Sequence, residues 1–375
     1  MSKENYRRLG DYIREVDVRN RDLEVKELLG VSISKEFIPS IANTIGTDMS
    51  SYKVVEPLQF AYGPVTSRNG DKVSIALYTG KGKIIISQAY TVFEVKNQDE
   101  LLPEYLMMWF RRPEFDRYAR FKSHGSAREL FSWEEMCDVF LPIPPIEQQR
   151  KIVAEYEAVS RRIRLNEQMI TRLEETAQAL YHKMFVDGID KENLPEGWRM
   201  GTLGEVAMYV DEKISLDNVR NSVYISTETM LKDRKGIALS TNMPESGRGT
   251  KFKRDDILIS NIRPYFKKIW KASYAGACSN DILCLRSKNG FKSSLLYSIL
   301  EQDIFFDYVM AGSNGVKMPR GDKKWIMNYN IIIPTIELVE IYDSIISCFD
   351  VCSTNYRTEN LKLLELQFLF LSKIG

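Results

Sequence analysis

Residues 156–184 read YEAVSRRIRLNEQMITRLEETAQALYHKM, and this stretch predicts a long coiled-coil helix. Its inward residues recur at alternating steps of three and four, which is the spacing of a heptad seam. Only Asn166 among them is polar, and a single seam asparagine commonly fixes the register of paired helices. The inward residues are Tyr156, Val159, Ile163, Asn166, Ile170, Leu173, Ala177, Leu180 and Met184.

The same pattern returns 190 residues later, as part of a longer repeat. Phe115 and Phe305, like Gly125 and Gly315, are identical pairs at that offset, which holds without a gap from residue 115 to residue 183. This length indicates a duplicated domain, because the repeats of solenoid proteins are about 20–50 residues long. The second seam, which has three polar members, comprises Ile346, Phe349, Ser353, Tyr356, Asn360, Leu363, Gln367, Phe370 and Ile374.

Each repeat begins with a segment of mixed α and β character, which we call a head. Short β-branched runs predict strands at 83–87, 91–95 and 281–285. Residues 101–121 predict a helix interrupted at Pro113, and proline-rich exits at 140–145 and 331–334 end a strand before each long helix. We therefore predict an α+β fold with a first head (1–145), a central helix (146–190), a second head (191–335) and a C-terminal helix (336–375).

The two seams require the long helices to bury their apolar faces. Each helix of about 40 residues would extend about 60 Å at a rise of about 1.5 Å per residue. We expect an antiparallel coiled coil with pseudo-twofold symmetry, because each helix leads away from its own head. Independent packing of each helix on its own head is the alternative. Two heads at a fixed separation suit a rigid periodic target, and duplex DNA is the obvious example.

Composition places the chain among ordinary globular proteins. The chain is 44% hydrophobic and 27% charged, which is typical of a globular protein. Its length of 375 residues indicates more than one domain. No apolar run approaches the roughly 18 residues needed to span a bilayer, and the first residues do not resemble a signal peptide. We expect a cytoplasmic protein that does not engage membranes. Five cysteines without a CxxC pair, and only His124 and His182, predict reduced thiols and no metal site.

Charge is unevenly distributed between the two heads. Residues 191–335 carry 22 Lys and Arg against 16 Asp and Glu, a net charge of +6, whereas residues 1–145 carry 20 against 21, a net charge of −1. The basic second head suits a polyanionic partner such as DNA, and an unevenly charged surface without such a partner is the alternative.

Several phrases along the chain resemble one known family. Residues 141–153 read LPIPPIEQQRKIV and are similar to the entry into the first conserved helix of specificity subunits of type I restriction-modification systems. Residues 254–265 (RDDILISNIRPY) and 315–320 (GVKMPR) are similar to phrases of that family's target-recognition domains. The resemblance spans essentially the whole chain, but residues 336–340 (IELVE) depart from the expected glutamine-containing run.

The resemblance implies a subunit without catalytic activity that reads double-stranded DNA. Each head would read one half of a bipartite and asymmetric site, and the helices would set the gap and dock two modification subunits. S-adenosylmethionine, ATP and Mg²⁺ would belong to the modification subunits and to any restriction subunits, so we expect no cofactor in this chain.

Side chains that can pair with base edges or neutralise phosphates are candidates for DNA binding. Those of the first head are Tyr62, Ser67, Arg68, Asn69, His124, Ser126 and Arg128. Those of the second head are Arg248, Lys251, Asn261, Arg263, Tyr265, Lys267, Lys268, Asn314, Lys317 and Arg320. Lys267 and Lys268 fit phosphate contacts best, because they are adjacent point charges.

Two other classes of function compete with DNA reading. A metal-dependent nuclease could use Asp71 with Glu94 and Lys96, but the constant offset places Cys284 where Glu94 stands. A coiled-coil assembly scaffold with protein-binding heads is the other alternative. The loops rich in Arg, Lys and Asn argue against the scaffold, and strong salt dependence of DNA binding would distinguish the two.

Overall fold

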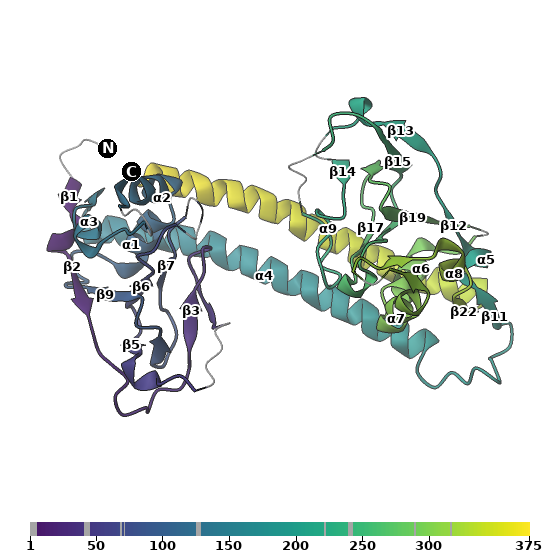
Figure 1. Cartoon of the computed structure of the whole chain (residues 1–375), viewed down its shortest axis with the longest axis horizontal. Coiled ribbons are helices and arrows are strands. Elements are labelled where there is room, and N and C mark those ends of the chain that lie inside the picture. The colour runs from purple at the N-terminus through teal and green to yellow at the C-terminus, as the bar shows by residue number, and fades with distance from the viewer. Residues whose placement is uncertain are drawn as a thin grey trace. The chain divides into compact units, whose positions relative to one another are not determined.

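The computed structural model describes residues 6–40, 46–67, 70, 72–124, 129–220, 223–238, 243–288, 290–315 and 317–375. Its contacts divide the chain into unit 1 (Met1–Asn166 with Thr358–Gly375) and unit 2 (Glu167–Arg357). Each unit holds one head and parts of both long helices, α4 (Ile146–Phe185) and α9 (Ile336–Lys373) (Figure 1). The division therefore falls inside the helices, which begin at the residues expected from the sequence.

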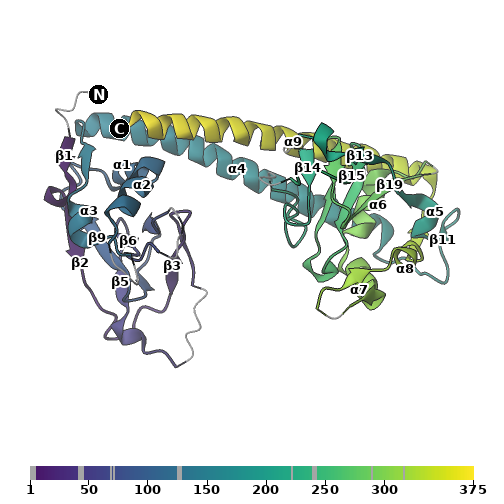
Figure 2. The same ribbon diagram turned by 45° about the horizontal axis from the view of Figure 1, so that its top comes forward.

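The first head is built on a four-stranded antiparallel sheet in the order β2-β9-β6-β7. Phe60 lies opposite Phe93 in this sheet, with the two rings stacked 4.8 Å apart. Phe110 packs edge-on against both rings and brings α1 onto the sheet (Figures 1 and 2). The strands are β1 (Tyr6–Arg8), β2 (Ile13–Val16), β3 (Leu29–Val31), β4 (Phe37–Pro39), β5 (Lys53–Val55), β6 (Phe60–Tyr62), β7 (Ile75–Leu77), β8 (Ile84–Ile86), β9 (Thr91–Val95) and β10 (Phe140–Pro142).

The helices of the first head confirm the predicted interruption at a proline. They are α1 (Pro103–Phe110), α2 (Pro113–Lys122) and α3 (Trp133–Cys137). Pro103 and Pro113 stand at the start of their helices, where the missing N–H leaves no intrahelical bond unmade. The predicted run at 83–87 forms β8, and the run at 91–95 forms β9.

The second head repeats this architecture with the order β12-β19-β16-β17 and adds a second sheet, β13-β15-β18-β14. Its helices are α5 (Leu203–Val206), α6 (Ser293–Leu300), α7 (Asp303–Ala311) and α8 (Lys323–Met327). Its strands are β11 (Arg199–Thr202), β12 (Ala207–Tyr209), β13 (Lys213–Ser215), β14 (Tyr224–Ile225), β15 (Arg248–Phe252), β16 (Ile257–Ser260), β17 (Ile269–Lys271), β18 (Gly276–Cys278), β19 (Ile282–Ser287), β20 (Ser313–Asn314), β21 (Arg320–Gly321) and β22 (Asn330–Ile333).

Structural equivalence between the heads corrects one sequence alignment. In the first head Arg14 lies opposite Glu94, and in the second Met208 lies opposite Arg286. Arg286, and not Cys284, therefore occupies the position of Glu94. The offset of 190 fails here because two residues fewer separate the strand from the following helix in the second head. The Glu94 carboxylate accepts hydrogen bonds from the side chains of Arg14 and Gln59, so its contacts are with neighbouring residues on the surface of the sheet.

The long helices run antiparallel within each unit. In unit 1, Ser160 bonds Gln367 and the later residue Asn166 bonds the earlier residue Asn360. In unit 2, the Phe185 ring packs edge-on against Tyr342, 5.2 Å away. Every seam residue expected from the sequence is buried or half-buried in both helices.

Both helices also pack on the heads. Pairing of the two helices and packing on the heads, which were given as alternatives, therefore occur together. Tyr156 of α4 and Leu371 and Ile374 of α9 belong to the core of the first head. Tyr181 and Phe185 of α4, with α9 residues Val339, Tyr342 and Ile346, belong to the core of the second head. Each large apolar side chain buried in this way contributes about 1.5–3 kcal/mol.

Candidate nucleic-acid interface

In the second head, two segments chosen separately from the sequence lie against one another. The chain leaves the central strand β16 at Asn261, and the hairpin β20–β21 approaches it from the C-terminal side. Ile262 pairs with Arg320 in an antiparallel bridge, and the Arg263 N–H donates to the Pro319 carbonyl at 2.9 Å. The strand exit and the hairpin therefore form one surface, to which we refer as the second loop pair.

The first head contains the same arrangement. Val65 pairs with Leu130 in an antiparallel bridge, and the Thr66 N–H donates to the Glu129 carbonyl at 3.0 Å. His124 also pairs with Leu130, as Asn314 pairs with Arg320 in the second head. The strand exit (65–67) and the loop flanked by His124 and Leu130 form the first loop pair. The same pairing of backbone segments thus presents different side chains in the two heads.

The second loop pair contains strained backbone and unpaired polar atoms. Arg263 and Lys267 adopt left-handed backbone conformations with φ of 51° and 49°, which side chains larger than glycine adopt infrequently. The Asn261 Oδ1 and Arg263 Nε atoms are buried and make no hydrogen bond with any described residue. Such atoms are uncommon in folded proteins because losing water without gaining a partner costs about 1–3 kcal/mol.

A turn at residues 279–281 connects the second loop pair to strand β15. The Asn261 N–H donates to the Asp281 carbonyl at 2.9 Å, and Arg320 pairs with the Asp281 carboxylate at 3.1 Å. The neighbouring Asn280 amide donates to the Arg248 carbonyl, and its oxygen accepts from the Lys213 ammonium at 2.8 Å. Lys213 was not among the residues chosen from the sequence, because its place beside the turn depends on strand pairing between β13 and β15.

Several of the chosen residues of the second head have partners within the chain. Lys251 pairs with Glu212 at 2.8 Å, and the Lys268 ammonium donates to the Thr227 carbonyl at 2.6 Å. Lys267 pairs with Asp303 at 2.8 Å, beside Arg234, and these cations hold the pKa of the Asp303 carboxyl below its usual range. Burial lowers the pKa of Lys268. The expectation of two free phosphate contacts at Lys267 and Lys268 is therefore corrected to one ion pair and one structural hydrogen bond.

Exposure separates the remaining chosen residues. Tyr62 is fully buried against Phe93 and Phe131, so its expected role in DNA contact is corrected to a core role. Ser67 is exposed, and His124 is exposed with its imidazole 3.8 Å from Glu135. Arg68, Asn69, Ser126 and Arg128 lie outside the described residues. In the second head, Arg248, Tyr265, Asn314, Lys317 and Arg320 are exposed.

The described residues contain neither a cluster of metal ligands nor a membrane-spanning helix. No group of three or more His, Cys, Asp or Glu side chains among them is placed to hold a metal ion. No helix within the described ranges combines the length and apolarity that crossing a membrane requires.

Part of the chain matches a known family model. Residues 35–175 match the model of the type I restriction modification DNA specificity domain, a range that includes the first loop pair and much of α4. The chain carries a type I restriction-modification DNA specificity domain. Over residues 35–175 this match confirms the resemblance seen in the sequence, and it favours DNA specificity over the assembly-scaffold alternative.

One solved S subunit shares the fold of this chain, and two further solved structures are similar over their full length. The S subunit of the type I restriction-modification system from M. genitalium has a TM-score of 0.58 at 13% identity, covering 100% of this chain and 97% of that one. The HsdS subunit from Thermoanaerobacter tengcongensis is 20% identical, with a TM-score of 0.38 and coverage of 99% and 97%. A chain from a structural study of complex assembly and conformational transition in the type I R-M system is 19% identical, with a TM-score of 0.48 and coverage of 100% and 98%. No curated protein sequence matches the chain.

Proposed function

We propose that the two heads read the two halves of a bipartite and asymmetric DNA site. The long helices set the unread gap between the halves and dock two modification subunits, which carry the adenine methyltransferase chemistry. The chain itself has no catalytic role, and S-adenosylmethionine, ATP and Mg²⁺ bind to its partners. Restriction subunits, where they exist, join the same cytoplasmic complex.

The observation that carries this proposal is the shared backbone frame of the two loop pairs. The bond from Thr66 to Glu129 recurs as the bond from Arg263 to Pro319. Around that bond the first head presents His124 and Leu130 where the second presents Asn314 and Arg320. Because direct readout depends on the identity and placement of side chains, the same frame with different residues predicts different half-sites and an asymmetric target.

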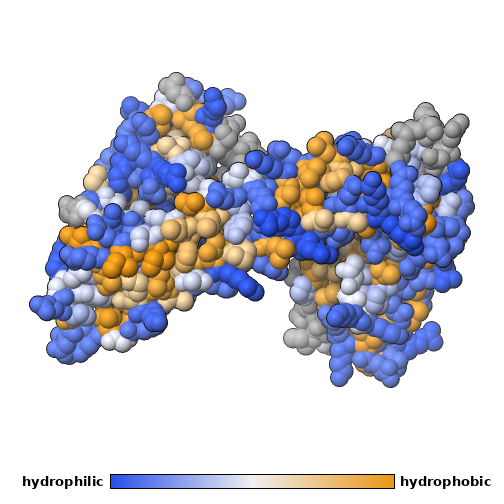
Figure 3. All heavy atoms as spheres, turned by 180° about the vertical axis from the view of Figure 1, so that it is seen from behind, coloured by the Kyte–Doolittle hydropathy of each residue, from blue (hydrophilic) through white to orange (hydrophobic). Residues whose placement is uncertain are grey.

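Exposed apolar residues on the helices support docking of protein partners. In unit 1, Leu361, Leu364 and Phe368 are 61%, 50% and 57% exposed on α9, and Leu165 of α4 is 49% exposed. The α9 residues follow steps of three and four and therefore form a second apolar stripe, outside the seam. Figure 3 shows patches of hydrophobic residues, coloured orange, on one face of the molecule. Contiguous apolar surface of this kind commonly marks a protein interface.

The test is methylome sequencing of cells with and without this chain, in which the modification subunit is retained. We expect adenine methylation at one asymmetric bipartite motif to disappear with the chain. Replacing residues 191–335 by the second head of another specificity subunit should change one half of the motif and leave the other half and the gap intact.

An unchanged methylome, obtained with a modification subunit of demonstrated activity, would contradict the proposal. Methylation that changes in both halves after the exchange of one head would contradict the assignment of one half-site to each head.

A further inference from the structure

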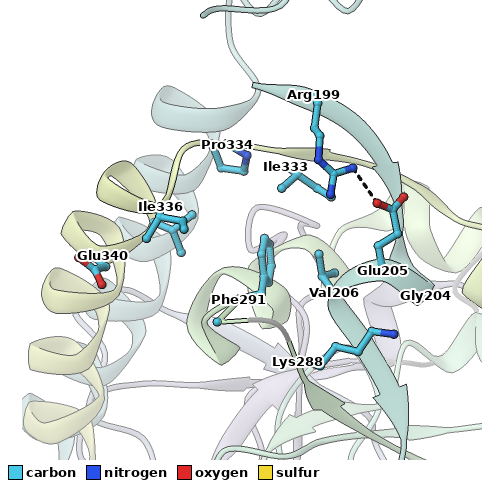
Figure 4. Close-up of a pocket in the computed structure, with 12 residues that line it drawn as sticks. Arg199, Gly204, Glu205, Val206, Lys288, Phe291, Ile333, Pro334, Ile336 and Glu340 are labelled. Atoms are coloured by element: carbon cyan, nitrogen blue, oxygen red, sulfur yellow. Dashed lines mark hydrogen bonds and ion pairs between the residues drawn. The ribbon is translucent and has the colours of Figure 1, made fainter. Parts of the chain in front are cut away.

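A pocket of about 500 Å³ lies in unit 2, where the second head meets the first turn of α9. Apolar side chains, including Val206, Phe291 and Val339, line it together with the backbone of Gly290 and Pro334. Charged groups stand around them, including the Arg199–Glu205 ion pair (Figure 4). Small-molecule sites are typically of this size, mostly apolar, and contain a few polar groups that fix orientation.

The first head fills the equivalent position with its own glutamine. Gln149, on the first turn of α4, is 0% exposed, and its carboxamide makes three hydrogen bonds. Its Nε2 donates to the carbonyls of Glu100 and Pro144, each at 2.8 Å. Its Oε1 accepts from the Leu102 N–H at 2.9 Å, which satisfies a backbone donor at the N-terminus of α1. A primary carboxamide thus matches this set of backbone groups in both donors and acceptors.

The second head keeps the surroundings and lacks the carboxamide. At the offset of 190 residues, Gln149 becomes Val339, while Glu100 and Pro144 become Gly290 and Pro334, which both line the pocket. A valine side chain can neither donate nor accept a hydrogen bond.

A second substitution enlarges the same space. In the first head the backbone N–H of Lys96 donates to the Tyr12 carbonyl at 2.8 Å. In the second head the backbone N–H of Lys288 donates to the Val206 carbonyl at the same distance. Valine therefore replaces tyrosine at a lining position. Two large side chains of the first head have smaller counterparts here, and a pocket lies beside them.

We propose that this pocket binds a small molecule that carries a primary carboxamide on an apolar stem. The carboxamide occupies the place that Gln149 fills in the first head and bonds the backbone of Gly290 and Pro334. It also bonds the N–H of Lys292, which is the N-cap of α6 as Leu102 is of α1. Phe291 and Val206 cover the stem. Lys288 and Glu340 bear opposite charges at the pocket, so it also accommodates a zwitterionic ligand such as the free amino acid glutamine.

The test is a titration of the full-length protein with propionamide, followed by methyl or amide chemical shifts of unit 2. We expect a saturable shift at millimolar concentrations, because a ligand of so few atoms has limited affinity. Propionate, which has the same shape but a negative charge and no N–H donor, should bind at least about tenfold more weakly. L-Glutamine in place of propionamide tests whether the charged residues contribute.

Two variants at one position provide the matched comparison. Val339→Gln should occupy the pocket in place of the ligand, raise the thermal midpoint of the protein and weaken propionamide binding by at least about tenfold. Val339→Leu fills volume without supplying donors or acceptors, and it should not reproduce the rise in the midpoint.

The titration of the unmodified protein keeps the proposal falsifiable whether or not either variant folds. Absence of a saturable shift with propionamide would overturn it, as would equal binding of propionamide and propionate. Undiminished binding to a folded Val339→Gln protein would show that the ligand lies elsewhere.

Discussion

A single buried ion pair shows how individual residues hold the first head. The Lys35 ammonium lies 2.7 Å from the Asp116 carboxylate, and the two side chains are only 6% and 12% exposed. Lys35 also donates to the Phe110 carbonyl, and Asp116 accepts from the Val73 N–H at 3.0 Å. The pair therefore joins the loop after β3, the segment before β7 and helix α2.

Removing one charge of this pair should destabilise unit 1 strongly. We expect Asp116→Asn to lower the free energy of unfolding by about 3–5 kcal/mol, because Lys35 would remain buried without a counter-charge. The control is Glu147→Gln, which breaks the exposed Glu147–Arg150 pair and should cost less than about 1 kcal/mol. Denaturant unfolding measures both variants, and equal effects would contradict the assignment.

Arg263 is the residue of the second loop pair from which we expect the largest effect on DNA. Arg263→Ala should weaken binding to the cognate duplex by about 10–100-fold, the range for one good base contact. It should also relax sequence preference in one half-site only. Arg117→Ala in the first head removes an equal charge from an exposed position and serves as the control. Fluorescence anisotropy at fixed salt measures both, and an equal loss in the two variants would indicate a charge effect alone.

A carboxyl group in unit 2 predicts a dependence of stability on pH. Burial raises the pKa of Glu301 to about 8 from an ordinary value of 4.5, against the opposing influence of Gln178 and Arg234. Glu174 reinforces the rise, and Lys271 opposes it. The folded state holds this proton more tightly than the unfolded chain does. The stabilisation is therefore complete below pH 4.5 and is lost as the pH rises towards 8.

Glu301→Gln removes this titration and isolates its effect. We expect the thermal midpoint of the parent to fall relative to that of the variant between pH 5 and pH 8. Differential scanning calorimetry at both pH values measures the change. A constant difference between the two proteins would contradict the raised pKa.

Side-chain identity predicted candidates for the DNA surface. Contacts with other residues of the chain determine which of these side chains remain available to contact DNA. Tyr62 has a side chain that suits either DNA contact or a core, and only the fold reveals its burial against Phe93 and Phe131. Lys267 meets Asp303, which lies 36 residues later and beyond three strands and helix α6, so no local pattern records the contact. Lys213 was missed for the same reason.

At the scale of elements, the heptad pattern predicted the long helices and their inward faces because a helix converts sequence spacing directly into direction. Loop lengths gave no such signal. The strands that precede α1 and α6 are therefore offset by 192 or more residues, while those helices and the later strands β10 and β22 keep 190. The seam asparagine also found a specific partner, since the Asn166 amide donates to Asn360 Oδ1 at 2.8 Å and to Glu359 Oε2 at 2.9 Å.

Replacing this polar contact tests its role in helix pairing. Asn166→Leu alone should destabilise the protein by about 1–2 kcal/mol, because Asn360 loses its partner in the seam. The double change with Asn360→Leu should recover at least the original stability, since two apolar residues can pack together. Thermal unfolding of the single and double variants measures this coupling, and additive losses would contradict it.

For the whole molecule, the proposed ruler makes the gap in the DNA motif a function of helix length. Seven residues inserted after Asn166, with seven more before Thr358, preserve heptad phase and lengthen both helices by about 10 Å. That length corresponds to about three base pairs at 3.4 Å each. We expect the methylated motif to gain about three unread base pairs with both half-sites unchanged.

An insertion of two residues at each place serves as the control, because it breaks the seam and should abolish methylation. An unchanged gap with the seven-residue insertions would contradict the ruler, whatever the state of the half-sites.

The interleaving of the two units has a consequence for biosynthesis. Leu371 and Ile374 complete the core of the first head, so that head leaves the ribosome early but finishes folding only when translation has reached the last residues. Premature termination near residue 357 would remove nothing from unit 2, yet it would leave Tyr156 and its neighbours uncovered. A nonsense mutation shortly after codon 357 would thus impair the first head, which is encoded more than 200 codons earlier.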